Sequence, residues 1–245
     1  MHLEPVGGVA GDMLLAALLD VGADDAGIER VFASVHLSGL ALTTERVHLH
    51  GETALHVRSL AQESIPVHRH LDDIAAMLAT MTLSPSARAR ALEIFTLLAD
   101  VEAHVHQTTR DAVHLHEVGQ LDSVLDVVGI VVALESLGNP RVTCEILPSG
   151  RGVVETSHGP LECPVPAVRE LSRRCRIPLV DVDLPGETIT PTGVAALGVL
   201  AQFVACRPSL PVLQQGAGAG SKRFAARPNI VRAWRFATSE QATHA

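Results

Sequence analysis

Side chains that bind metals and transfer protons are concentrated in one short stretch, residues 113–129, with the sequence V-H-L-H-E-V-G-Q-L-D-S-V-L-D-V-V-G. His114 and His116 share a face if the chain there is extended. Asp122 and Asp126 share a face if the chain there is helical, and Gly119 permits a reversal between the two halves. The stretch therefore predicts a site for a divalent metal or for acid–base chemistry. A capped helix with surface histidines is the plainer alternative.

Histidines cluster beyond this stretch as well. Of the 13 histidines, six form three H-x-H pairs within residues 68–116, less than one third of the chain: His68 and His70, His104 and His106, His114 and His116. His104 and His106 point in different directions on a helix, so only one of them can face the same site. We take these residues as candidate metal ligands: His68, His70, His106, His114, His116, Glu117, Asp122 and Asp126. Among them, His116, Glu117 and Asp122 are the candidates for a catalytic role.

Several common catalytic motifs are excluded by spacing. His116-Glu117 resembles the start of the H-E-x-x-H helix of zinc proteases, but Gln120 stands where the second histidine is required. The chain has neither a G-x-S-x-G nucleophile motif nor a Walker A loop. Cys163, close to His158, is either a thiolate ligand for a soft metal or a buried inert thiol.

Two glycine-rich segments are candidates for binding a nucleotide phosphate. The turn before the first helix exposes backbone N–H groups, and the segment around residue 220 combines glycines with two cations. The candidates for cofactor binding are Gly8, Gly11, Asp12, Gly218, Gly220, Lys222 and Arg223. A helix-capping role for Asp12 and a tight surface turn near Lys222 are the structural alternatives.

Composition narrows the class of protein. The 245 residues are 47% hydrophobic but only 2% aromatic, so the core must be aliphatic. A net charge of −8 argues against nucleic-acid binding and against anionic membrane surfaces. The four cysteines form no C-x-x-C pair, and no apolar run approaches the roughly 18–20 residues of a membrane span. We expect a cytoplasmic protein with reduced thiols, no signal peptide and no transmembrane segment.

The elements that must position these residues alternate between strand and helix. We expect a hairpin over residues 41–60 and closing strands over 210–216 and 229–236. We expect helices over 14–21, 85–106, 164–174 and 194–204, and one that Asp122-Ser123 caps and Gly138 ends. This pattern predicts an α/β or α+β fold with a layered mixed sheet covered by helices. The domain should span residues 1–238, with a subdivision near 140 still open, followed by a disordered tail over 239–245.

Taken together, the motifs resemble the LarC family of nickel-insertion proteins, specifically its N-terminal portion. The resemblance rests on G-V-A-G-D-M from Gly8, H-R-H-L from His68, and the H-x-H-E-V-G-x-x-D-S-x-x-D pattern from His114. It continues through His158-Gly159, T-P-T-G from Thr190, G-x-G-A-G from Gly216 and R-P-N from Arg227. The sequence differs in having Glu4, Gly7 and Ala10 near the first motif and only residues 61–67 before the second.

The resemblance implies a nickel chelatase, a metal-inserting lyase. The enzyme would load nickel into pyridinium-3,5-bisthiocarboxylate mononucleotide, and so form the nickel-pincer nucleotide of lactate racemase-type enzymes. It further implies dependence on CTP and on Mg²⁺ or Mn²⁺. The CTP-binding C-terminal portion of the family lies beyond this sequence, so we expect a separate partner chain and an apo-racemase client. A homo-oligomer is compatible with these partners. Two other functions stay open: a non-catalytic nickel carrier or assembly subunit, and a metal-dependent nucleotide phosphohydrolase.

Overall fold

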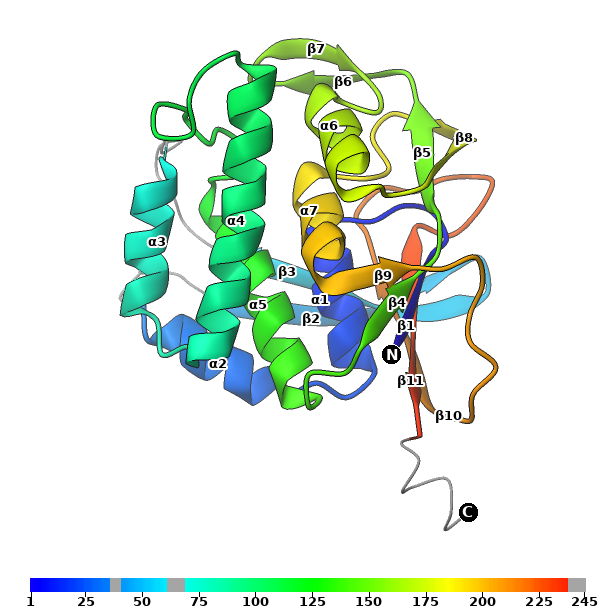
Figure 1. Cartoon of the computed structure of the whole chain (residues 1–245). Helices are drawn as coiled ribbons and strands as arrows, with labels where there is room; N and C mark the ends of the chain where they lie inside the picture. Colours follow the sequence, from blue (N-terminus) through cyan, green and yellow to red (C-terminus); the bar gives the residue numbers. More distant parts are fainter. Residues whose placement is uncertain (36–40, 61–68, 238–245) are drawn as a thin grey trace.

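A mixed sheet forms the centre of the computed structural model, which describes residues 1–35, 41–60 and 69–237 (Figure 1). In the described part, seven strands pair in the order β2-β3-β10-β11-β1-β4-β9. Their bounds are β1 His2–Pro5, β2 Ala41–Leu49, β3 Glu52–Leu60, β4 Val142–Cys144, β9 Ala201–Phe203, β10 Val212–Ala219 and β11 Ile230–Phe236. The sheet takes strands from both sides of residue 140. The predicted ligand His68 and the tail 239–245 lie outside the described residues.

The pairing is both parallel and antiparallel. β1 runs antiparallel to β11 and parallel to β4, while β3 runs parallel to β10 and antiparallel to β2. Each parallel neighbour needs a long crossover connection, and the helices supply these connections. The expected α/β class with a mixed sheet is confirmed.

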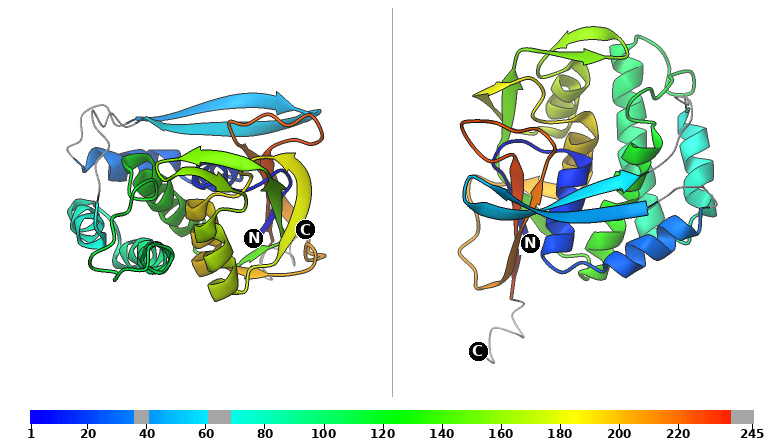
Figure 2. Two further views of the ribbon diagram at one scale, coloured as in Figure 1. Left: turned by 90° about the horizontal axis from the view of Figure 1, so that it is seen from above. Right: turned by 180° about the vertical axis from the view of Figure 1, so that it is seen from behind.

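The helices lie on one face of this sheet (Figure 2). Their bounds are α1 Gly11–Asp20, α2 Asp25–Ala33, α3 Leu71–Thr80, α4 Pro85–Val105, α5 Leu121–Ser136, α6 Pro166–Cys175 and α7 Pro191–Leu200. α1 packs directly on β3 and β10, and α5 packs on α1. The buried side chains of the core are almost all aliphatic, as the composition predicts, and Phe95 is the largest of the fully buried ones. No helix in the described residues is long and apolar enough to cross a membrane.

Glycine at one position in β10 allows α1 to lie close to the sheet. A Cβ atom on Gly218 would stand 2.0 Å from the carbonyl oxygen of Met13 and 2.5 Å from the amide nitrogen of Ala17. Real Cβ contacts are never this short, so any side chain here would push α1 away from the sheet. The G-x-G-A-G segment is thus strand for most of its length, and only Gly220 and the residues after it leave the strand.

Two smaller sheets extend the molecule beyond the carboxyl end of β1. β5 (Leu147–Arg151) pairs in parallel with β8 (Leu179–Pro185), and β6 (Val153–Thr156) forms a hairpin with β7 (Gly159–Glu162). A single bridge between Val9 and Ile189 links the turn before α1 to the segment before α7. This bridge places the amino ends of α1 and α7 side by side.

The opposite face of the large sheet carries charge. On β11, Arg232 donates hydrogen bonds to Glu4 of β1 and to Glu52 of β3, at 2.7–3.0 Å.

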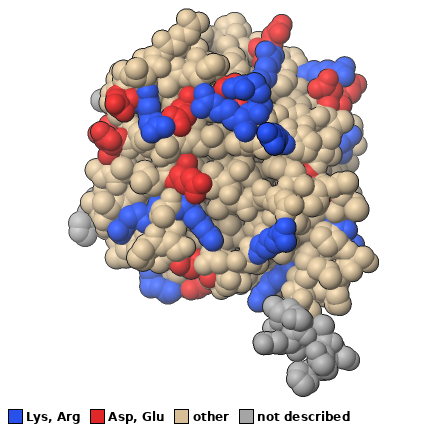
Figure 3. All heavy atoms as spheres, in the orientation of Figure 1, with Lys and Arg blue, Asp and Glu red and all other residues tan. Residues whose placement is uncertain are grey.

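On the face drawn in Figure 3, acidic and basic side chains are interspersed, with a dense basic group over α6. There Arg173 and Arg174 both bind Glu170.

Two expectations about helix ends are wrong. α5 begins at Leu121 with Gln120 as its N-cap, so Asp122 and Ser123 lie inside the first turn instead of capping it. The helix expected over 194–204 begins earlier, at Pro191, because proline suits the first turn, and it ends at Leu200. Residues 201–203 then form β9, because pairing with β4 prevails over their helical pattern.

Candidate functional site

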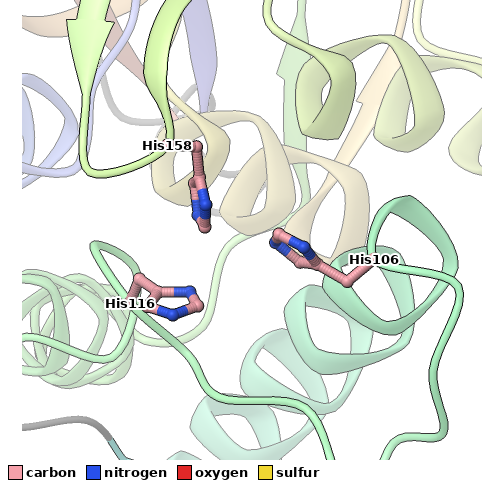
Figure 4. Close-up of side chains that lie close together, drawn as sticks. All are labelled: His106, His116 and His158. Atoms are coloured by element: carbon pink, nitrogen blue, oxygen red, sulfur yellow. The ribbon is translucent and has the colours of Figure 1, made fainter.

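Three histidines from separate parts of the chain form the candidate metal centre (Figure 4). His106 follows the last turn of α4, His116 lies in the loop before α5, and His158 lies in the turn between β6 and β7. One ring nitrogen from each histidine lies within 4.8 Å of the other two. Among the described residues, no other group of three or more His, Cys, Asp or Glu side chains brings its ligand atoms this close together. Imidazoles that bind one ion at about 2.1 Å hold their nitrogens roughly 3–4 Å apart. Small ring rotations would therefore close this histidine triad around a metal.

His106 is oriented by its own helix. Its Nε2 lies 3.4 Å from the carboxylate of Glu102, one turn earlier on α4. Metal-binding histidines commonly use their second nitrogen in such a contact, which fixes the ring orientation. Burial raises the pKa of Glu102, Glu117 raises it further, and His158 lowers it. His104 instead faces Glu170 of α6 at 3.8 Å, so only one member of this H-x-H pair reaches the centre, as expected.

The loop that carries His116 is anchored from two sides. Leu115 is fully buried, and its amide donates to the carbonyl oxygen of Arg69 at 2.8 Å. The buried guanidinium of Arg69 donates to the carbonyl oxygen of Gly119 at 2.8 Å. A Cβ atom on Gly119 would stand 2.3 Å from the carbonyl oxygen of Leu115, so the tight turn requires glycine. These contacts fix the backbone on both sides of His116.

Glu117 connects this loop to the turn that carries His158. Its Oε1 accepts a hydrogen bond from the amide of Ser157 at 3.0 Å. Within the turn, the hydroxyl of Thr156 accepts from the amide of His158 and donates to the carbonyl oxygen of Gly159. Glu117 thus positions two of the three histidines relative to each other.

The triad opens into a small hollow of about 230 Å³. Apolar side chains from β7 and the start of α6, including Leu161, Val165 and Ala167, form one wall. Glu102, Glu117 and Glu187 contribute negative charge. A cation would be attracted to this hollow, and the apolar wall would limit its contact with water.

A larger cleft of about 590 Å³ adjoins the hollow, and both are lined by Glu117, Val118, Glu187 and Pro191. The first residues of α1, α5 and α7 line this helix-terminus cleft. Ala10 and Gln120, the N-caps of α1 and α5, make no side-chain capping bond. Helix amino ends favour anions, because their backbone N–H groups and dipoles point outward.

Close packing brings these three helix ends together. A Cβ atom on Gly193 of α7 would stand 2.9 Å from Cα of Ala10. A Cβ atom on Gly11 of α1 would stand 2.7 Å from the carboxylate of Asp126 on α5. Small residues at both crossings are therefore needed for the cleft to form.

Charges of both signs line the cleft. Burial raises the pKa of Asp12 to about 6, against the lowering effect of backbone N–H groups, and Asp122 raises it further. Burial also raises the pKa of Glu187, while the nearby Lys222 lowers it. Lys222 donates to the carbonyl oxygen of Glu187 at 2.5 Å. The cleft therefore suits a ligand that carries both negative and positive groups.

The structure separates the predicted metal ligands into three places. His106 and His116 belong to the triad, and Glu117 lies between the triad and the cleft. His70 and His114 lie next to each other, with ring centres 4.2 Å apart, beside the triad. Asp122 and Asp126 line the cleft. Of the predicted catalytic residues, His116 and Glu117 are therefore together, and Asp122 is on the cleft side.

The predicted cofactor-binding residues fall into two groups: some line the cleft and the others support its backbone. Gly11, Asp12, Gly220 and Lys222 line the helix-terminus cleft. Gly8 packs against the backbone of Thr188, and Gly218 packs against α1. The guanidinium of Arg223 donates to backbone carbonyl oxygens, including that of Gly220 at 2.8 Å. Gly8, Gly218 and Arg223 thus shape the backbone around the cleft.

His158 is the member of the triad that the sequence analysis did not place with the other two. It was paired with Cys163, five residues away, because nothing local connects it to His106 or His116. Burial raises the pKa of Cys163, which disfavours a thiolate at neutral pH. The turn His158-Gly159 was visible in the sequence, but only the fold brings it to α4.

The family model and the similar proteins found for this chain carry the same description. The family model described as nickel insertion protein matches residues 1–245. The chain belongs to the nickel insertion protein family. Relatives in this family include a protein of Myxococcus xanthus named "Putative nickel insertion protein", which is 41% identical over 236 residues. Proteins of the same name from Thermomicrobium roseum and Geobacter sp. strain M21 are 39% and 40% identical. No solved structure matches the chain.

These alignments cover 94–95% of the chain but only 57–60% of the relatives' own length. The chain therefore spans less than two thirds of the length of these relatives.

Proposed function

We propose that this chain inserts nickel into a dithiolated pyridinium mononucleotide and so forms a nickel-pincer nucleotide. One observation carries the proposal: a three-imidazole centre opens next to a cleft lined by three helix amino ends, with residues shared between them. Nickel, as the ion to be inserted, would bind the triad. The mononucleotide would occupy the cleft, with its sulfur atoms directed to the triad.

The chemistry of the ligands gives the transfer a direction. Imidazole is a good ligand for nickel, and thiolate-type sulfur is a softer one. Three neutral imidazoles would hold nickel tightly enough to select it and weakly enough to release it to a ligand with two sulfur atoms. No change of oxidation state is needed, because the step exchanges the ligands of one ion.

The cleft offers partners for the other end of the substrate. The phosphate would lie at the amino ends of α1 and α5, close to Lys222. The positive pyridinium ring would lie towards the carboxylates of Glu117 and Glu187. Asp12 and Asp122 would accept protons that are released when the substrate binds metal.

The remaining elements of the proposal concern the whole reaction. We propose that it depends on CTP with Mg²⁺ or Mn²⁺, bound by a partner equivalent to the remaining length of the relatives. The product would be delivered to an enzyme of the lactate racemase type.

A reconstitution tests this proposal. The purified chain would be incubated with nickel and the dithiolated mononucleotide, with and without CTP and a supplied C-terminal partner, and activation of apo-racemase would be measured. We expect activation with partner and CTP, and none from a His116→Ala variant. Absence of activation under all conditions, by a folded chain that binds nickel, would contradict insertion.

Two other functions give different outcomes in the same experiment. A nickel carrier would bind nickel tightly without forming the nucleotide product; the three clustered imidazoles alone would suffice for this candidate. A nucleotide phosphohydrolase would release phosphate from CTP without nickel transfer; the carboxylates that line the cleft favour this candidate.

A further inference from the structure

The histidines near the triad form a continuous row. The rings of His70 and His114 have their centres 4.2 Å apart, and the rings of His114 and His116 have theirs 6.3 Å apart. His116 then lies 4.6 Å from His158 and 5.8 Å from His106 by the same measure. His70 and His114 are outside the triad, so the row has two members that the proposed function does not use.

Local structure explains this arrangement. Arg69 and Leu115 pair as an antiparallel bridge, which extends the chain on both sides. Because side chains alternate along an extended chain, His114 and His116 project to the same side of Leu115. The residue after Arg69 is His70, which the bridge brings beside His114.

His70 has a feature typical of metal-binding histidines. Its Nδ1 lies 2.9 Å from the carbonyl oxygen of Val113. A carbonyl only accepts hydrogen bonds, so Nδ1 carries the proton and Nε2 carries the lone pair. Metal-binding histidines usually donate their second N–H to such a group, which fixes the tautomer that binds the metal.

The spacing of the two rings suits a shared ion. Two imidazoles that bind one metal in adjacent positions, with metal–nitrogen distances of about 2.1 Å, have ring centres roughly 4.6–5.3 Å apart. The rings of His70 and His114, at 4.2 Å, would need to separate by only about 0.5 Å to reach this range. The pair lies at the surface, where His114 is exposed and His70 is half-buried. Water can therefore fill the remaining coordination positions of an ion held there.

We propose that His70 and His114 form a second, outer nickel site that passes nickel to the triad. The inference rests on the proposed function for the identity of the metal. Two imidazoles bind nickel less tightly than three, so the ion would move from the outer site to the triad down a gradient of affinity. The transfer replaces His70 and His114 by His116, His158 and His106 as ligands of the same Ni²⁺ ion.

Nickel binding to the full chain tests this inference. The variants are His70→Gln with His114→Gln, His114→Gln alone, and His158→Gln. His104→Gln is the matched control, because His104 belongs to an H-x-H pair and is exposed but lies outside the row. Equilibrium dialysis would give the number of bound nickel ions, and release from a chromogenic nickel complex would give the rate of loading.

We expect two nickel ions per wild-type chain, one bound more tightly. The double variant and His114→Gln should lose the weaker ion, keep the tight one, and load the triad several-fold more slowly at limiting nickel. His158→Gln should lose the tight ion and keep the weaker one, and His104→Gln should match wild type. Two bound ions or an unchanged loading rate in His114→Gln would overturn the inference.

This result is separable from that of the insertion reaction. If the double variant inserts nickel at the wild-type rate under limiting nickel, the outer site fails while the proposed function stands. If the outer site and the triad bind nickel as expected but no nucleotide product forms, the proposed function fails and the two binding sites stand.

Discussion

At the scale of single residues, the buried carboxyl group of Asp12 makes the stability of the folded protein depend on pH. Its pKa in the folded protein is about 6, above the usual value of 3.8, mainly because of burial. The folded state therefore binds this proton more tightly than the unfolded state does. The resulting stabilisation is full below about pH 4 and is lost as the pH rises through about 6.

We expect Asp12→Asn to remove this dependence. Relative to wild type, the variant should gain stability on the order of 2 kcal/mol at pH 7 and little at pH 4. Urea unfolding at several pH values would measure the difference. A difference between the two proteins that does not change between pH 4 and 7 would contradict the assignment of a raised pKa to Asp12.

Glu117 allows a positioning role to be separated from direct metal binding. Its carboxylate accepts from the amide of Ser157, and the side-chain oxygen of glutamine can accept the same bond. We expect Glu117→Ala to weaken nickel binding about 10-fold, within the range for residues that orient metal ligands. Glu117→Gln should bind nickel nearly as wild type does. Equal losses in both variants would show that Glu117 is itself a ligand.

Sequence analysis selects candidate residues by their type and local spacing. It is most informative where local spacing alone determines which way a side chain points. Only one histidine of the pair 104 and 106 could face the site, and the structure selects His106. Local spacing also explains the contact between Glu102 and His106, which lie four residues apart on the same helix face. His158 could not be assigned, because its distance from His106 depends on how the β6–β7 hairpin packs against α4.

At the scale of elements, the contact between α1 and β10 determines where the helix-terminus cleft lies. Any side chain at Gly218 would collide with the backbone of α1. We expect Gly218→Ala to destabilise the fold by about 3 kcal/mol or more, the upper range for overpacking. Chemical denaturation would measure this change.

Gly51→Ala is the control for Gly218→Ala. Gly51 has a φ of +83° but nothing within 4 Å of a Cβ atom, so its substitution tests backbone strain alone. This variant should lose only about 1–2 kcal/mol. Similar losses in the two variants would contradict the argument that close helix packing requires Gly218.

Elements were predicted best where the periodic pattern was long. The hairpin over 41–60 and the helix from Pro85 were found almost to the residue, because alternation and a proline start are strong local signals. The boundary at Leu200 was missed, since pairing of β9 with β4 is a long-range contact. The packing of Gly218 against α1 was missed for the same reason: glycine runs in strands and in phosphate loops look alike in sequence.

At the scale of the whole molecule, nickel should act as a cross-link. The triad joins the end of α4, the loop before α5 and the β6–β7 turn. Nickel that binds only the folded state adds about 2.7 kcal/mol at 100 times its Kd. We expect a higher Tm with nickel, reversed by a chelator, and slower amide exchange in the β6–β7 hairpin. Unchanged exchange in that hairpin would contradict a site that includes His158.

The class of fold was predictable from alternating strands and helices, but the order of strands was not. β1 at the start of the chain pairs with β11 near its end, and such pairing is not encoded in any local window. The convergence of three helix ends on one cleft follows from that order, so the cleft also emerged only from the structure.

Nickel X-ray absorption on the chain with one equivalent of nickel tests the central claim most directly. We predict scattering from three imidazoles for wild type and for His104→Ala, and from two imidazoles or fewer for His158→Ala. An identical nickel spectrum in wild type and His158→Ala, with nickel still fully bound, would contradict the histidine triad as the nickel centre.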